Sequence, residues 1–135
     1  MKDSGIFRIV EKTSKNDTKS KISKGKRGEI IAVKYLSDLS YDILEVNYTA
    51  IDFEIDIIAK DKDQLVFVEV KLKKTKRFGS GFEEVNIKKQ KKIINCSKIY
   101  LRDNKYSQNT SVRYDIISID EGKINHIKNA FGSIY

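Results

Sequence analysis

Apolar residues recur with helical spacing in two segments of the chain. Positions three and four apart predict one helix over residues 26–39 and a second over residues 83–100. In the second segment one stripe places a lysine among apolar residues: Val85, Lys89, Ile93 and Cys96. Each helix therefore has one face suited to packing against a sheet.

Alternating apolar residues predict five strands, over residues 43–48, 54–59, 65–72, 112–119 and 123–128. Short polar turns separate the first three, so we expect these to be sequential and antiparallel. The resulting order, α-β-β-β-α-β-β, predicts an α/β protein with helices packed on a central mixed sheet. Residues 1–23 are polar and basic and are expected to form an N-terminal extension to a domain over residues 24–135.

Two charged residues interrupt the most apolar strand. Residues 65–72 are hydrophobic on both faces, which is typical of an interior strand covered on both sides. Glu69 and Lys71 lie on one of these faces. Because burying an unpaired charge is costly, each requires a partner, a metal ion or a water-filled cleft.

The preceding strand carries a similar anomaly, since Glu54 and Asp56 share a face. If the two strands pair, Asp56 comes close to Glu69. Such carboxylates suit Mg²⁺ or Mn²⁺, and a nearby Lys71 could orient an attacking water or stabilise negative charge on a phosphate. The alternative is an Asp/Glu–Lys ion pair at the end of a solvated strand, and Glu54 could instead pair with one of the many lysines.

Composition narrows the class of protein. A length of 135 residues suits one domain. We expect a soluble cytoplasmic protein without a membrane partner, because the chain has neither an apolar run of about 18 residues nor an apolar signal core after Met1. A single cysteine, Cys96, excludes an internal disulfide framework, and a single histidine, His126, argues against a Cys/His zinc site.

The formal net charge of +8 is unevenly distributed. Residues 1–28, 29–63, 64–102 and 103–135 carry net charges of +6, −6, +8 and 0. A basic excess suggests a nucleic-acid partner. The number of lysines could also follow from an AT-rich genome, but such a bias would not favour an acidic block between two basic ones.

The spacing of Asp56, Glu69 and Lys71 resembles the PD-(D/E)XK motif of restriction-endonuclease-like nucleases. Residues 25–36, 54–59 and 65–71 further resemble the GxxGExxAxxYL, GEIDLIA and LVFVEVK segments of the YraN-type family of bacterial proteins. The resemblance covers about residues 24–131. Thr49 and Phe53 depart from it, replacing a usual arginine and a usual glycine. It implies a restriction-endonuclease-like αβββαβ core, related to Holliday-junction resolvases, and a role in DNA processing.

The resemblance also implies roles for individual residues. Asp56 and Glu69 would bind Mg²⁺ or Mn²⁺ together with the Val70 carbonyl, and Lys71 would orient or activate water. Two helix residues complete the implied catalytic set, one near the metal and one near the scissile phosphate: Glu29 and Gln90. The alternative for Glu29 is a carboxylate favoured by the helix dipole, and for Gln90 a solvent-facing side chain.

Basic residues around this centre are expected to contact phosphates: Lys24, Lys26, Arg27, Lys73, Lys74, Lys76, Arg77, Lys88 and Lys89. The predicted function is therefore a metal-dependent DNA endonuclease acting on branched or structured DNA in repair or recombination. A homodimer would suit two symmetric cuts. The alternatives are a nucleic-acid-binding accessory protein with an idle nuclease fold and a protein-interaction domain. We expect His126 to be structural.

Overall fold

Five strands form one mixed sheet in the order β1-β2-β3-β4-β5. The computed structural model describes residues 24–73 and 85–132, with side chains over residues 26–72 and 85–132. Along the chain the elements are α2 (Lys24–Asp38), β1 (Asp42–Ala50), β2 (Phe53–Asp61), β3 (Gln64–Lys73), α3 (Ile87–Asp103), β4 (Val112–Asp120) and β5 (Lys123–Phe131). The order is the one that the hydrophobic pattern predicts.

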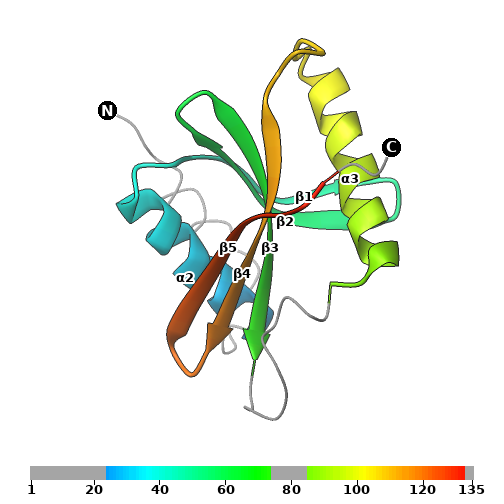
Figure 1. Cartoon of the computed structure of the whole chain (residues 1–135). Coiled ribbons are helices and arrows are strands. Elements are labelled where there is room, and N and C mark those ends of the chain that lie inside the picture. The colour runs from blue at the N-terminus through cyan, green and yellow to red at the C-terminus, as the bar shows by residue number, and fades with distance from the viewer. Residues whose placement is uncertain (1–23, 74–84, 133–135) are drawn as a thin grey trace, which may run out of the picture.

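The connection between β3 and β4 determines how the helices are placed. β1, β2 and β3 pair antiparallel, as expected from their short turns, and β4 pairs antiparallel with β5. β3 and β4 run parallel, and the chain between them includes α3. Figure 1 shows α2 and α3 on opposite sides of the sheet. The predicted α/β class, with helices flanking a mixed sheet, is confirmed and is compatible with a restriction-endonuclease-like core.

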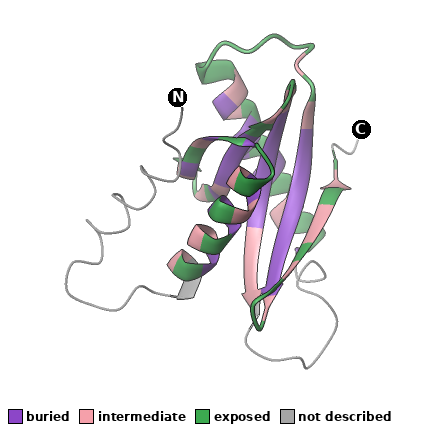
Figure 2. Ribbon diagram, turned by 90° about the vertical axis from the view of Figure 1, so that its left-hand side faces the viewer, coloured by how far each residue is buried: buried purple, intermediate pink, exposed green. Residues whose placement is uncertain are grey.

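Two hydrophobic clusters hold the helices to the sheet. On the α2 side, Val33 and Leu36 pack with β-strand residues that include Val66 and Val68. On the α3 side, buried residues of the helix pack with the alternate residues of the same strands: Ile93, Ile94, Ile58, Phe67 and Ile116. Figure 2 shows the central strands buried along most of their length. The prediction that β3 is an interior strand covered on both faces is therefore correct.

The second helix begins later than predicted. Val85 and Asn86 precede α3, which starts at Ile87 rather than at residue 83. The Asn86 side chain accepts a hydrogen bond of 2.9 Å from the Lys89 backbone N–H. Asparagine at this position satisfies a backbone donor that the first helical turn leaves unpaired, so it favours the observed start. Neither α2 nor α3, the two helices of the described part, is long and apolar enough to cross a membrane.

The turn between β1 and β2 has an unusual backbone. Ala50 pairs with Phe53, which leaves Ile51 and Asp52 as a two-residue turn. Ile51 has a φ of 58°. This left-handed region favours glycine, and a β-branched residue is disfavoured there because its side chain crowds the backbone. The turn is thus built around a residue that local preference does not explain.

A buried aspartate joins the last two strands. Asp115 of β4 is completely buried. One of its oxygens, Oδ1, accepts hydrogen bonds of 2.9 Å from Arg113 Nε and from the Asn129 backbone N–H. The other, Oδ2, lies 2.7 Å from His126 Nε2. The charge of Asp115 is thus surrounded by donors from β4 and β5.

The hydrogen-bond network of Asp115 includes further residues on the α2 side of the sheet. The Arg113 guanidinium also donates to Tyr41 Oη at 2.6 Å, Gln64 Oε1 at 2.9 Å and Asp61 Oδ2 at 3.1 Å. Tyr35 of α2 joins through a 3.0 Å hydrogen bond between its hydroxyl and Nδ1 of the histidine, His126. Residues from α2, from the segment before β1, from the adjoining ends of β2 and β3, and from β4 and β5 therefore meet in one polar cluster. His126 lies within it, as its expected structural role requires.

Removing the Asp115 charge should strongly destabilise the fold. In Asp115→Asn, the buried guanidinium of Arg113 loses its closest anion, and we expect the free energy of unfolding to fall by about 3–5 kcal/mol. Urea unfolding followed by circular dichroism measures this. The matched control is Asp38→Asn, because Asp38 forms an exposed 3.2 Å pair with Lys34 and should change the free energy by less than about 1 kcal/mol. Equal effects of the two substitutions would contradict the role of the network.

The network should also make stability depend on acid pH. Burial alone would raise the pKa of Asp115, but the hydrogen bonds from His126, Arg113 and the Asn129 N–H outweigh it and lower the pKa. The stabilisation is therefore complete above the unfolded-state pKa, about 3.9, and is lost as the pH falls through the lower folded-state pKa. Unfolding measured from about pH 6 to pH 2 should show the advantage of the wild type over Asp115→Asn shrinking. A constant difference would contradict the prediction.

Candidate active site

The strands β2 and β3 separate next to Asp56 and Glu69. Their pairing runs from Asp61 and Gln64 to Ile57 and Val68. Beyond that point β3 continues to Lys73 alongside β4. A side chain replaces the next strand-to-strand hydrogen bond, because Asp56 Oδ2 accepts from the Val70 backbone N–H at 2.8 Å.

This contact brings the Asp56 carboxylate to the backbone of Val70, directly after Glu69. Asp56 was expected to lie near Glu69, and it bonds to the residue that directly follows Glu69. The N–H and C=O of one strand residue point to the same side. The Val70 carbonyl therefore faces the region where the Asp56 carboxylate lies.

Glu69 is buried and paired with a helix lysine. Its side chain is only 6% exposed. Lys89 Nζ of α3 lies 2.7 Å from Glu69 Oε2, whereas Lys71 Nζ lies 3.9 Å from the same atom. The closest cation to the motif glutamate thus comes from α3 and not from the motif lysine.

The sequence pattern assigned Lys89 to phosphate binding only. Its position in the stripe with Ile93 and Cys96 was the signal that it points inward, since both of those residues are buried. Burial alone would lower the pKa of Lys89, but its hydrogen bond and charge interaction with Glu69 outweigh this and raise the pKa. Lys89 is therefore held as a cation in the site.

Burial and neighbouring carboxylates together determine the pKa of Asp56. Burial and the charge of Glu69 raise the pKa of Asp56 well above its usual range, against the opposing hydrogen bond from the Val70 N–H. Glu29 and Glu54 raise it further. Three acidic residues from α2, β2 and β3 therefore act on Asp56.

Close packing of α2 on β3 brings Glu29 into this group. Gly28 is buried, and a Cβ at this position would lie 3.4 Å from Leu72 Cβ and 3.5 Å from Val70 Cγ1. The start of α2 therefore rests on the strand segment that carries Glu69. Glu29, the next residue, is half-buried and approaches the site from the opposite face to Lys89.

The donor set fits a hard divalent cation. In residues 24–73 and 85–132, no group of three His, Cys, Asp or Glu side chains is arranged to hold a metal ion. Mg²⁺ often uses only one or two protein carboxylates and keeps several waters. Asp56, Glu69 and the Val70 carbonyl meet that requirement, and a cation would relieve the repulsion that raises the pKa of Asp56.

The remaining candidate residues are placed differently. Gln90 Nε2 donates to the Val85 carbonyl at 2.9 Å, so this side chain holds the segment that enters α3. Three basic residues lie on the helices, with Arg27 and Lys88 exposed and Lys26 half-buried. The other basic candidates lie outside the described side chains: Lys24, Lys73, Lys74, Lys76 and Arg77.

Comparison with known proteins identifies the family. The model of a family described as "Uncharacterised protein family UPF0102" matches residues 28–119. The chain belongs to UPF0102. This is the YraN-type family that the motifs resemble, so that prediction is confirmed.

Individual UPF0102 proteins are similar over most of their length. A UPF0102 protein from Persephonella marina is 47% identical over 114 residues, which cover 83% of this chain and 96% of the relative. One from Clostridioides difficile is 46% identical, with 80% and 96% covered. One from Francisella tularensis is 44% identical, with 82% and 95% covered. The region matched to UPF0102 contains all the residues of the carboxylate and lysine cluster: Glu29, Glu54, Asp56, Glu69, Lys71 and Lys89.

Breaking the Glu69–Lys89 pair should cost stability. In Lys89→Met the buried Glu69 carboxylate loses its 2.7 Å partner and, within the described residues, keeps the Lys71 pair at 3.9 Å. We therefore expect the free energy of unfolding to fall by about 2–3 kcal/mol. Lys88→Met is the matched control, since the exposed Lys88 should contribute less than about 0.5 kcal/mol. Adding Glu69→Gln to Lys89→Met should recover part of the loss. Urea unfolding of the wild type, Lys89→Met, Glu69→Gln, the double variant and Lys88→Met tests this, and additive effects of the Lys89 and Glu69 substitutions would refute a direct interaction.

Proposed function

We propose that this protein is a divalent-metal-dependent DNA endonuclease that hydrolyses phosphodiester bonds in branched or structured DNA during repair or recombination. The observation that carries the proposal is the meeting of Asp56, Glu69 and Lys71 where β2 and β3 separate. A four-way junction requires two symmetric cuts, which favours a homodimer as the acting form on that substrate.

The carboxylates Asp56 and Glu69, with the Val70 carbonyl, would hold Mg²⁺ or Mn²⁺. When bound, such an ion neutralises charge on the phosphate and makes water more acidic. In the structure, Lys89 Nζ lies 2.7 Å from Glu69 Oε2 and pairs with this oxygen. The ion pair must therefore loosen before Glu69 Oε2 can act as a ligand, and this releases an ammonium group next to the substrate phosphate.

Lys71 acts on the water and on the phosphate. It lies on the same face of β3 as Glu69, with 3.9 Å between Lys71 Nζ and Glu69 Oε2. Its ammonium group orients the attacking water and stabilises negative charge as the water oxygen bonds to phosphorus. The P–O ester bond opposite the water breaks, the leaving oxygen takes up a proton, and the water loses one to solvent or to a nearby carboxylate such as Glu29.

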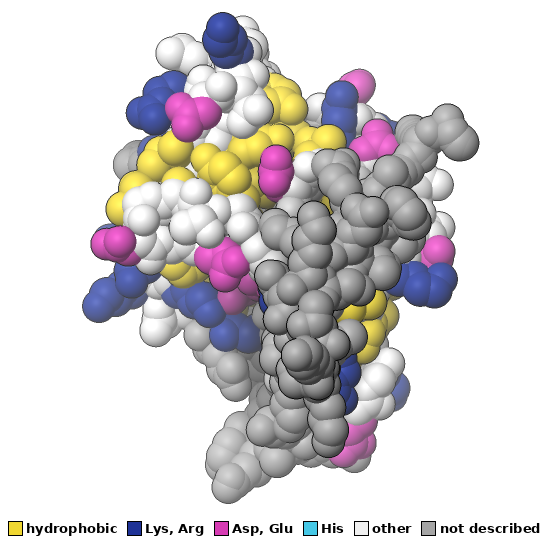
Figure 3. Space-filling model, turned by 180° about the vertical axis from the view of Figure 1, so that it is seen from behind, with side chains coloured by type: hydrophobic (Ala, Val, Ile, Leu, Met, Phe, Trp, Pro, Cys, Tyr) yellow, Lys and Arg dark blue, Asp and Glu magenta, His cyan; other side chains and the backbone are white. Residues whose placement is uncertain are grey.

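Positive charge for the DNA backbone is concentrated on α3. The helix has six lysine or arginine residues and one aspartate. Lys88, Lys91 and Lys92 are exposed near the end that carries Lys89. Figure 3 shows the molecule from behind, with basic and acidic side chains interspersed around hydrophobic ones. We therefore assign phosphate contacts to the exposed lysines of α3, with affinity that falls as salt increases.

A second function is favoured by one observation. The ion pair between Lys89 and Glu69 occupies the motif carboxylate, as expected for a nucleic-acid-binding accessory protein with an idle site. Such a protein would bind DNA in a salt-sensitive manner without metal dependence. Its binding and activity would be unaffected by substitution of Asp56.

Cleavage assays distinguish the two functions. We expect the purified chain to cut four-way junctions, forks or single strands in Mg²⁺ or Mn²⁺ and to be inactive in EDTA. Asp56→Asn and Lys71→Met should each reduce the rate at least about 100-fold, because they remove a ligand and the group that orients water. Glu45→Gln, at an exposed carboxylate of β1, should cleave like the wild type.

The accessory function makes the opposite prediction. A wild-type protein that binds these DNAs but leaves them intact with both metals would exclude the endonuclease. Loss of activity in Glu45→Gln as well as in Asp56→Asn would show that the effect is not specific to the site.

A further inference from the structure

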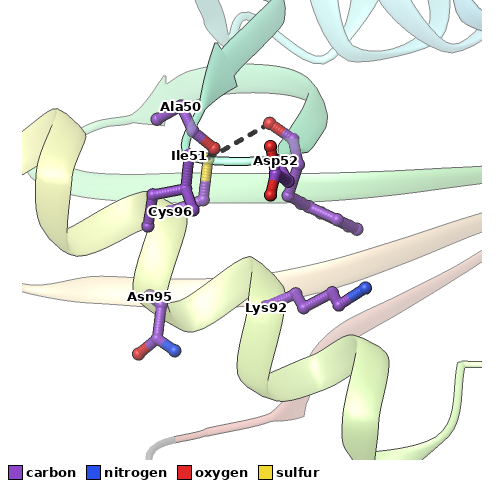
Figure 4. Close-up of a pocket in the computed structure, with 7 residues that line it drawn as sticks. Ala50, Ile51, Asp52, Lys92, Asn95 and Cys96 are labelled. Carbon is purple, nitrogen blue, oxygen red and sulfur yellow. Dashed lines mark hydrogen bonds between the residues drawn. The ribbon is translucent and has the colours of Figure 1, made fainter.

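A cavity of about 210 Å³ lies between the β1–β2 turn and α3. The turn contributes Ala50, Ile51, Asp52 and Phe53 to its lining, and the helix contributes Lys92, Asn95 and Cys96. Figure 4 shows Cys96 pointing from α3 toward the turn, with Lys92 extending on the side of Asp52. The cavity therefore has an apolar floor and a charged rim.

Hydrogen bonds of the cysteine hold the floor together. Cys96 is 1% exposed, and its thiol lies 3.8 Å from both the Ala50 and Phe53 carbonyl oxygens. Burial raises the pKa of the Cys96 thiol, which keeps it neutral. The floor is thus suited to packing against an uncharged, flat group rather than to binding an ion.

The wall of the cavity includes the strained residue of the turn. Ile51 combines a φ of 58° with a side chain that is 69% exposed. An exposed isoleucine in a conformation that favours glycine lowers stability without a packing benefit in the described structure. Strain of this kind concentrates at binding sites, and the exposed Ile51 side chain is suited to contact with an apolar ligand.

The cavity is close to the carboxylates of the candidate active site. Phe53 and Asp56 are three residues apart on β2, which corresponds to about 10 Å along a strand. Lys92 and Lys89 are three residues apart on α3 and so are neighbours on one helix face. A DNA strand with a phosphate at Glu69 would therefore pass the cavity within about three nucleotides, at 3.4 Å per nucleotide of a stacked strand.

We propose that this cavity receives one unpaired base of the DNA strand bound at the active site. The inference rests on the proposed function and adds a feature of the substrate, namely a nucleotide outside the base-paired stack close to the cleaved phosphate. The base packs against Ile51 and Phe53, and the Lys92 ammonium contacts its phosphate.

Size and charge support this occupant. A cavity of about 150 Å³ lined by apolar side chains admits a six-membered ring, so about 210 Å³ is sufficient for a single base. The exposed lysines of α3 attract a polyanion to the rim, which a neutral apolar metabolite would not require. Contact with an apolar surface is tolerant of sequence, because every base has a flat face.

The test measures binding of the full chain, without divalent ions, to forked DNA containing unpaired nucleotides and to a fully paired duplex. With 2-aminopurine placed in turn at each unpaired position, we expect one position to change fluorescence on binding. An abasic residue at that position should weaken wild-type binding about five- to tenfold, as expected for the loss of one base contact.

Two substitutions locate the effect. Ile51→Gly suits the positive φ and should fold at least as well as the wild type, yet it should bind the fork about five- to tenfold more weakly and be insensitive to the abasic residue. Lys92→Ala should weaken binding to the fork more than Lys91→Ala, which removes an exposed charge outside the cavity.

The outcomes separate the two proposals. If the wild type binds and cleaves the fork but Ile51→Gly retains full sensitivity to the abasic residue, the pocket inference is wrong and the proposed function stands. If the wild type binds no DNA at low salt, both are wrong.

Discussion

The parallel pairing of β3 with β4 is the constraint on which the rest of the structure depends. Parallel neighbours cannot be joined by a tight turn, so the chain must leave the sheet at the end of β3 and cross back to the end where β3 began. Here the return includes α3, which covers the face opposite α2. This crossover brings Lys89 to Glu69 and places Lys92 and Cys96 beside the β1–β2 turn. The candidate site and the adjacent cavity are therefore both consequences of one strand pairing.

Two ionic clusters of this sheet differ in how completely they are neutralised. Around Asp115, each oxygen of the carboxylate has protein donors, and Arg113 has several acceptors. This cluster can be explained by the fold alone. Around Asp56, burial and neighbouring carboxylates raise its pKa, while among the described residues Glu69 pairs closely with Lys89 and at a longer distance with Lys71. A protein does not need such an arrangement for stability, which is why the second cluster is the better candidate for chemistry.

Strand periodicity was sufficient to locate Asp56, Glu69 and Lys71, because alternation in β3 fixes which residues share a face. It was also sufficient for the order of the elements. It did not reveal the partners of Arg113, which lie at positions 41, 61 and 64 and come together only when the sheet forms. The apolar stripe of the helix indicated that Lys89 points toward the sheet. The lysines next to it in the sequence made the segment resemble a solvent-exposed basic surface. The start of α3 was missed because Asn86, a capping residue, was counted as part of the helix.

The cluster around Asp115 has a consequence for where this domain ends. The family model matches residues up to 119, before β5 begins at Lys123. Yet β5 supplies His126 and the Asn129 N–H to the buried carboxylate of β4. A chain that stopped at the end of the matched region would leave that charge at a newly opened edge, short of two donors. The region that the family model matches is therefore shorter than the segment that folds as a unit, and β5 belongs to the domain through these hydrogen bonds.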